Sequence, residues 1–309
     1  CLAAMEKGYD ILLEKPISPK PEEILQLNQR AKELGRRVLV CHVLRYTPFY
    51  EKVKEIIDSG ALGEVVSIHA SEGVGTWHQA HSYVRGHWAV REKSSPMILA
   101  KSCHDLDILS WLMDRPCRSV ASFGELGYFT PANRPDGAPP RCTDGCPVAD
   151  TCPYNALRYI DPHRDGLKLI MDGGASASAE EVTAWLQTSP WGRCVYTCDN
   201  DVVDRQVLAL QFDGGKTATF SMTAFDSGRN LEVMGTRASL RGGDFLKHEL
   251  GHDILLRDHH GGRVQRFNLT VAKGGYDGHG GGDAGLVNQL YNQMTVGKAD
   301  AMKSSLARS

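Results

Sequence analysis

The sequence predicts an α/β protein: a remnant of a Rossmann-type parallel sheet, followed by an α+β domain with a large, mostly antiparallel open sheet. The first observation is an early strand, helix, strand order in which both strands are continuous apolar runs, as in parallel sheets covered on both faces. The second is the change after Gly63, where strands follow one another through short turns. We expect two domains, residues 1–45 and 46–309, with the boundary near Tyr46.

The first domain is expected to contain two strands and one helix. An apolar run at residues 9–13 ends at Glu14-Lys15-Pro16, and the run 38–44 is the next strand. The Pro-rich stretch 18–21 marks a helix start, and apolar residues follow at helical spacing until Gly35: Ile24, Leu27, Ala31 and Leu34. Because proline fixes its backbone and lacks an N–H, we expect Lys15 to be held rigidly at the carboxyl edge of the sheet.

The second domain begins with an expected helix at 48–59 and continues mainly as strands. Asp213-Gly214-Gly215 between two apolar runs is a hairpin signal. The segment 128–161 is rich in Pro, Gly and Cys and longer than most loops, which indicates either a functional or a mobile insertion. The expected strands are 64–71, 119–125, 205–212, 217–225, 231–234, 239–241 and 253–257.

Neither end of the sequence has the pattern of a natural terminus. Residues 1–10 resemble the second half of a helix that ends at Gly8, without an initiator methionine, so we expect the natural chain to start upstream of Cys1. Residues 299–309 begin a helix-compatible pattern with no terminator, which leaves the same expectation open for the C-terminal end.

The composition excludes several classes of protein. The 309 residues are 41% hydrophobic with a formal net charge of -2, which is typical of a soluble globular protein. No stretch approaches the roughly 18 to 20 apolar residues that span a bilayer, and no Lys/Arg-rich block offers a phosphate-binding face, so membrane and nucleic-acid roles are not expected. Nine cysteines are too few for a disulfide scaffold, and we therefore expect a cytoplasmic location.

A predicted helix at 97–113 carries the first candidate for chemistry. Steps of about 100° per residue place Lys101, His104 and Asp107 on one arc of this helix. A neutral imidazole can accept a hydroxyl proton, a neighbouring ammonium lowers its pKa, and an aspartate can orient the ring. A solvated helix face is the alternative. The opposite arc is apolar and is expected to pack on the sheet: Ile98, Leu99, Cys103, Leu106, Leu109 and Met113.

Five sequence features together resemble the Gfo/Idh/MocA family of NAD(P)-dependent oxidoreductases, which act on sugars and cyclitols. They occur in family order over most of the chain: Glu14-Lys15-Pro16 after a strand, the run 40–46 that ends in Leu44-Arg45-Tyr46, the segment 59–65, Ser102-Cys103-His104-Asp105-Leu106-Asp107, and the segment 231–240. The resemblance implies a Rossmann domain whose glycine-rich pyrophosphate loop would precede Cys1.

The resemblance also implies roles for individual residues. Glu14, Lys15 and Pro16 would lie beside the nicotinamide and ribose of NAD or NADP, with Pro16 shaping the turn through a cis peptide bond. Arg45 belongs to the implied cofactor-binding residues. His104 would be the general base that takes the substrate hydroxyl proton as hydride leaves for the nicotinamide.

One position departs from the family pattern. Many members carry an aspartate four residues before the histidine, where this chain has Ala100, followed by Lys101. Lys101 is therefore expected to replace that carboxylate as a catalytic and substrate-binding donor beside Lys15, His104 and Asp107. An ammonium there would suit an alkoxide or a sugar that carries a carboxylate.

A cluster just upstream of this helix is a second candidate for substrate binding. It combines aromatic faces with polar tips, which suits a carbohydrate ring, and Arg85 could clamp a carboxylate or phosphate. We single out Arg85 and Trp88, and the alternative is an ordered surface loop with aromatic anchors. The cluster contains Trp77, His78, His81, Arg85, His87 and Trp88.

The cysteines of the long segment leave a metal site open. Cys142-x3-Cys146-x5-Cys152, with Cys194-x3-Cys198 downstream, could bring thiolates together around zinc or an iron-sulfur cluster, but the spacing to Cys152 fits no standard pattern. Free thiols and a disulfide are the alternatives. Gly278-His279-Gly280-Gly281-Gly282-Asp283 resembles a phosphate cradle, yet it follows no buried strand, and a flexible helix entry from which His279 could reach the cleft is the simpler interpretation.

The leading functional hypothesis is therefore an NAD(P)-dependent dehydrogenase or reductase of a sugar, cyclitol or related polyol. Two alternatives are an NAD-dependent glycoside hydrolase of the same family and a non-catalytic sensor of sugar or dinucleotide. An open antiparallel sheet can pair face to face between subunits, so a homo-oligomer is expected.

Overall fold

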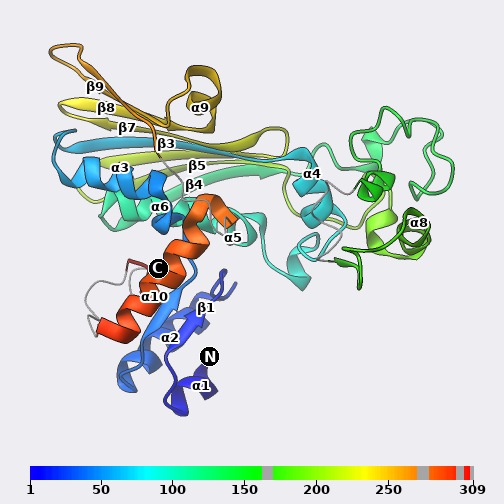
Figure 1. Cartoon of the computed structure of the whole chain (residues 1–309), viewed down its shortest axis with the longest axis horizontal. Helices are drawn as coiled ribbons and strands as arrows, with labels where there is room; N and C mark the ends of the chain where they lie inside the picture. Colours follow the sequence, from blue (N-terminus) through cyan, green and yellow to red (C-terminus); the bar gives the residue numbers. More distant parts are fainter. Residues whose placement is uncertain (162–169, 270–277, 297–302, 307–309) are drawn as a thin grey trace.

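The computed structural model describes residues 1–161, 170–269, 278–296 and 303–306, and it confirms the predicted fold class. A small two-stranded parallel sheet lies beneath a large eight-stranded sheet (Figure 1). No helix among these residues is both long and apolar enough to cross a bilayer. The domain boundary expected near Tyr46 falls in the 3-10 helix η1 (Val43–Tyr46) and stays a prediction.

The small sheet has the expected strand, helix, strand order. Strand β1 (Ile11–Leu13) pairs in parallel with β2 (Val38–Val40), with Leu12 opposite Leu39. The chain end returns to the other edge of β2, where the Val40 N–H donates to the Ser304 carbonyl over 2.9 Å. The helix expected to begin at 299 is therefore absent from residues 303–306, and the rest of that pattern lies outside the described residues. The helices of this part are α1 (Leu2–Glu6) and α2 (Pro21–Glu33).

The large sheet contains all seven expected strands and an eighth, β10 (Val264–Phe267), that was not expected. Neighbouring strands pair antiparallel except β3 and β6, which pair in parallel. The spatial order is β10-β9-β8-β7-β3-β6-β5-β4. The remaining bounds are β3 (Val65–Val74), β4 (Cys117–Glu125), β5 (Arg205–Phe212), β6 (Lys216–Thr223), β7 (Ser227–Gly235), β8 (Ala238–Gly243) and β9 (Ile254–Asp258).

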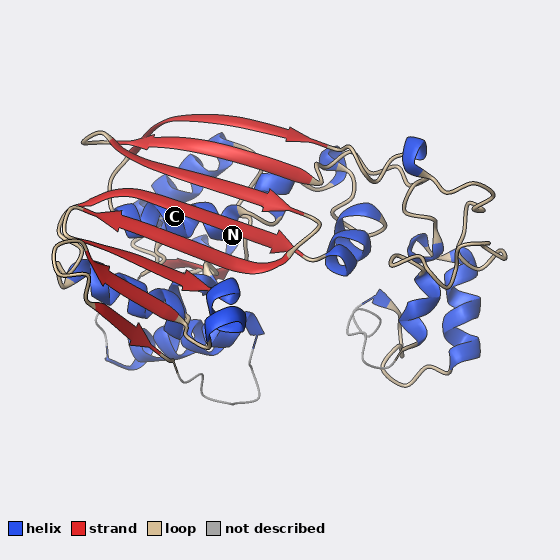
Figure 2. Ribbon diagram, turned by 90° about the horizontal axis from the view of Figure 1, so that it is seen from above, coloured by secondary structure: helices blue, strands red, loops and turns tan. Residues whose placement is uncertain are grey.

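Helices cover one face of this sheet and leave much of the other open (Figure 2). Strands β5 and β6 alternate buried and exposed residues, so one apolar row of each packs under α3 (Pro48–Asp58) and α6 (Cys103–Met113). The prediction of a single helix at 97–113 is wrong in one respect. It is broken at Lys101 and Ser102 into α5 (Met97–Ala100) and α6.

Helix α10 (Gly282–Val296) packs against η1, and its glycines make this approach possible. A Cβ at Gly282 would stand 2.4 Å from the Val43 carbonyl oxygen, and one at Gly285 would stand 2.6 Å from that of Tyr46. The Gly-rich stretch before α10 forms η7 (Gly278–Gly281). The close backbone approach therefore requires Gly282 and Gly285 of α10, whereas a Cβ at Gly280 of η7 would meet nothing within 4 Å.

A separate lobe extends beyond one end of the large sheet (Figures 1 and 2). It contains most of the long segment 128–161, which packs around two small cores of its own. The short helices in and near this lobe are α4 (Thr76–His78), η2 (Gln79–Val84), η3 (Arg91–Lys93), η4 (Pro131–Asn133), η5 (Ala156–Ile160), α8 (Ala179–Thr188) and η6 (Pro190–Gly192), while α9 (Asp244–Leu250) lies beside β7 and β8.

Candidate functional site

Lys15 connects the small sheet to the helical layer of the large one. It follows β1 after one intervening residue, Glu14, and its bond to Pro16 is cis. Its ammonium donates a hydrogen bond of 3.2 Å to the carbonyl of Ala100, the last residue of α5. The lysine singled out from the sequence therefore reaches the break between α5 and α6, one turn from His104.

His104 lies at the start of α6 and is 3% exposed. Neither of its ring nitrogens has a hydrogen-bond partner in the structure. Burial lowers the pKa of this imidazole to about 2, and the Lys15 ammonium acts in the same direction. At neutral pH the ring is therefore uncharged and has a free lone pair that can accept a proton.

Two further histidines lie near His104. The ring of His42 lies 6.5 Å from that of His104, and the ring of His279 lies 5.7 Å from it. His42 and Pro16 line a cavity of about 220 Å³, whereas His279 and Arg229 line another of about 310 Å³. His104 itself lines neither cavity, but each of its two neighbouring histidines lines one, and each cavity is large enough for part of a small molecule.

A buried network of charges lies beside the site. The Lys101 ammonium lies 3.1 Å from a carboxylate oxygen of Glu72, and the same oxygen pairs with Arg229 at 2.5 Å. Arg229 also donates to Asp105 over 2.7 Å. Burial raises the pKa of Asp105 to about 7, because it outweighs the attraction of Arg229.

The sequence patterns did not point to Glu72, Asp105 or Arg229 as site residues. One signal was available for Glu72, because it shares the inward face of β3 with Ile68 and Val74 and a carboxylate on an apolar face needs a partner. The structure also shows Lys101 held by Glu72, so its charge is compensated.

Arg45 and Asp107 are partners of each other. Two guanidinium nitrogens of Arg45 donate to the two Asp107 oxygens, the longer bond measuring 2.7 Å, and both residues are buried. Arg45 also donates to the Lys303 carbonyl. Because a buried pair is costly to separate, this placement argues against the expected roles of Arg45 in cofactor binding and of Asp107 in substrate binding. The nearest histidine to Asp107 is His42, at 3.5 Å, and not His104.

The structure places Arg85 inside the lobe and packs Trp88 against the core of the large sheet. Arg85 is 2% exposed, and it donates to the carbonyls of Arg193 and Tyr154, both over 2.7 Å, inside the lobe. The contacts of Arg85 argue against it as a substrate ligand, and the role expected for Trp88 stays a prediction. Another member of that cluster, His78, is affected by a charge of the site. Burial and the Lys101 ammonium lower the pKa of His78 to about 4.

The cysteine side chains that left a metal site open in the sequence do not form one in their present rotamers. Among the residues that the structure describes, no group of three or more His, Cys, Asp and Glu side chains is arranged to hold a metal ion. All nine thiols are free.

Comparison with known proteins supplies the family. Residues 54–270 match the model for the C-terminal alpha/beta domain of the Gfo/Idh/MocA oxidoreductase family. The protein YteT of Bacillus subtilis (strain 168) is 25% identical over 298 residues, which cover 93% of this chain and 68% of YteT. Inositol 2-dehydrogenase 4 of Saccharopolyspora erythraea is 29% identical over 121 residues, which cover 39% of this chain and 32% of that protein.

A solved structure shows the same fold. The WlbA dehydrogenase from Bordetella pertussis, in complex with NADH and UDP-GlcNAcA, aligns with a TM-score of 0.55 and 13% sequence identity. The alignment covers 99% of this chain and 67% of that one. The chain therefore spans about two thirds of the length of WlbA and of YteT.

Proposed function

The chain belongs to the Gfo/Idh/MocA family of oxidoreductases, and we propose that it transfers hydride between NAD or NADP and a hydroxyl-bearing carbon of a sugar, cyclitol or related polyol. The observation that carries this proposal is His104: a buried, neutral imidazole with two unpartnered nitrogens, next to an ammonium from a different sheet. Relatives whose names give inositol or a nucleotide sugar as ligand support the substrate class.

The unpartnered ring nitrogens give His104 its role in the chemistry. A buried polar atom without a partner is costly, and a ligand that supplies the missing hydrogen bond removes that cost. A substrate hydroxyl can donate to the free nitrogen, and His104 then takes its proton as the carbonyl forms. The reverse reaction returns the proton to the oxygen.

Lys15 is positioned to hold the reacting oxygen and to keep His104 neutral. The Ala100 carbonyl accepts one of its three N–H bonds, and the others remain for a ligand. An ammonium at this point stabilises negative charge that develops on the oxygen as its proton leaves. Lys101 has a supporting role, because Glu72 already balances its charge.

The residues around Lys15 fit a nicotinamide cofactor. A bound nicotinamide supplies the hydride acceptor or donor. Glu14, Lys15 and Pro16 would hold its ribose and ring at the end of β1, where parallel sheets bind dinucleotides. His104 on α6 is close enough to Lys15 to feel its charge, so the proton and the hydride would leave neighbouring atoms of one substrate.

A cofactor screen of the full-length protein tests the proposal. Absorbance at the reduced-nicotinamide band, with NAD⁺ and NADP⁺ and a panel of polyols and sugar acids, should reveal net reduction with at least one pair. Hydrolysis of a glycoside without net reduction would favour the glycosidase alternative. Binding of cofactor and polyol without turnover of any tested pair would favour a sensor.

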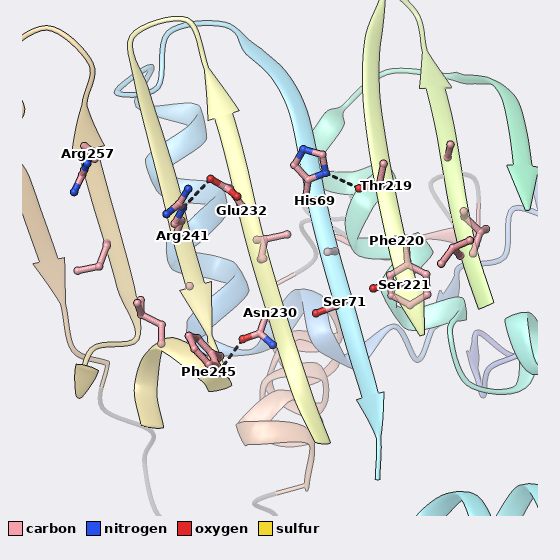
Figure 3. Close-up of a pocket in the computed structure, with 18 of the residues that line it drawn as sticks. His69, Ser71, Thr219, Phe220, Ser221, Asn230, Glu232, Arg241, Phe245 and Arg257 are labelled. Carbon is pink, nitrogen blue, oxygen red and sulfur yellow. Dashed lines mark hydrogen bonds and ion pairs between the residues drawn. The ribbon is translucent and has the colours of Figure 1, made fainter. Parts of the chain in front are cut away.

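The open face of the large sheet supports a homo-oligomer. It is hollowed over about 1020 Å³ and carries polar pairs, His69 with Thr219 and Arg241 with Glu232 (Figure 3). Phe123 is 77% exposed there, opposite Val207 on the next strand. Large exposed apolar patches mark interaction surfaces, and an open sheet face suits a second copy of the same face.

Val207→Glu should weaken this association. A charge on this face would be buried in the dimer without a partner, so we expect the dimer dissociation constant to rise by about a hundredfold or more. Light scattering after size-exclusion chromatography measures the change. Leu25→Glu is the matched control because Leu25 is an exposed leucine on α2, outside this face. Equal masses for the wild type and Val207→Glu would reject this face as the interface.

A further inference from the structure

Four cysteines of the lobe line one small cavity. Cys142, Cys146, Cys152 and Cys194 surround a volume of about 20 Å³, which is room for a single ion. Cys198, the fifth cysteine in this part of the chain, is not among the lining residues, and its thiol donates to the Cys194 carbonyl instead. The fold thus places four of these five cysteines around one cavity.

The backbone brings these four residues together from two distant segments. Cys142 donates its N–H to the Gly192 carbonyl over 2.9 Å, and Cys194 donates to the Pro140 carbonyl over 2.8 Å. These bonds form an antiparallel bridge between Arg141 and Arg193. Tight turns, closed by Ala149 to Cys146 and by Cys152 to Val148, hold the other two beside them.

The same cavity is lined by two arginines and by no aspartate or glutamate. Arg85 is 2% exposed, one of its nitrogens has no partner, and another lies 3.5 Å from the Cys142 sulfur. The Arg141 Nε is likewise buried without a partner. A buried guanidinium without a counter-ion is strongly unfavourable, so the site calls for negative charge that neutral thiols do not provide.

We propose that Cys142, Cys146, Cys152 and Cys194 bind one zinc ion as four thiolates. Four thiolates around Zn²⁺ carry a net charge of about −2, which Arg85 and Arg141 balance. The sulfurs must turn inward about χ1 to reach Zn–S distances of about 2.3 Å, because they do not form a metal-binding group as they stand. Each ligand loses its thiol proton to solvent, and no electron is transferred.

A bound zinc ion would stabilise the lobe, whose own apolar cores are small. It would also hold η2, which precedes α5 and α6 in the chain. Arg85, the residue after η2, contacts Cys142 of the cavity, and His81 of η2 forms a hydrogen bond with Tyr159 of η5. Small domains with little core are commonly stabilised by metals.

Metal analysis of the full-length protein, purified under reducing conditions, tests the zinc site. We expect about one zinc per chain in the wild type and in Cys198→Ser, the matched control, and less than about a fifth of that in Cys146→Ser. Cobalt in place of zinc should give an intense sulfur-to-cobalt charge-transfer band. Zinc retained by Cys146→Ser, or no zinc in the wild type, would overturn the proposal, as would iron with inorganic sulfide.

A second measurement avoids variants that fail to fold. In the wild type, iodoacetamide should label the exposed Cys117 with or without a zinc chelator, and should label the four cavity cysteines only after chelation. Chelation should also lower the Tm by roughly 5 °C or more. Equal labelling of Cys142 and Cys146 in both samples, or a disulfide between any two of the four, would contradict zinc binding.

Discussion

His104→Asn should reduce kcat by a factor of about 10² to 10⁴, the range expected when a general base is removed. Asparagine is close to histidine in size and polarity but cannot accept a proton at neutral pH. The loss should therefore appear in kcat rather than in cofactor binding, which is measured separately by fluorescence of the reduced nicotinamide. An unchanged kcat would remove His104 from the mechanism.

Two controls separate chemistry from folding. His248→Ala changes an exposed histidine on α9 and should leave kcat unchanged. Folding lowers the pKa of His104 below its ordinary 6.5, so below pH 6.5 the unfolded chain binds a proton that the folded chain excludes. This group therefore costs stability as the pH falls from 6.5, and His104→Asn should remove that part of the pH dependence of unfolding.

Much of the fold could be predicted because its signals are local. The run 205–212 contains the continuous apolar stretch Val207-Leu208-Ala209-Leu210, and β5 has the same bounds as the predicted strand. The parallel pairing of β1 and β2 follows from two apolar runs with a helix between them. Strand β10 was missed because Val264–Phe267 is short, lies at the sheet edge and has little apolar character.

The site was less predictable because its partners are distant in the sequence. Periodicity suggested Lys101, His104 and Asp107 as one outward arc, but the helix breaks at Lys101 and all of His104, Asp105 and Asp107 are buried. The two aspartates can be buried because each pairs with an arginine. Arg45 is 62 residues from Asp107, and Arg229 is 124 residues from Asp105. No local pattern specifies such pairs.

The same reason explains the placement of Arg85. A cationic side chain among aromatic residues resembles a sugar clamp in a sequence, yet its neighbours in space come from residues 142, 154 and 193. The spacing of Cys142, Cys146 and Cys152 was visible in the sequence. The fourth cysteine of the proposed zinc site, Cys194, is distant in sequence, and only the fold brings it to the same cavity.

Lys15→Met should lower kcat by about 10² or more, because it removes the ammonium while keeping a side chain of similar length and shape. It should also change the pH profile. The Lys15 charge helps to keep the pKa of His104 low, so without it that pKa rises and the acid limb of kcat/KM should move to higher pH.

This second effect distinguishes a residue that acts on the reacting groups from one that only holds the fold. A structural lysine would lower activity through stability and leave the shape of the pH profile unchanged. Lys7→Met, at an exposed lysine after α1, is the matched control and should alter neither quantity. If Lys15→Met lowers kcat but its acid limb coincides with that of the wild type, Lys15 and His104 do not share one site, and the hydride-transfer proposal loses the pair of residues on which it rests.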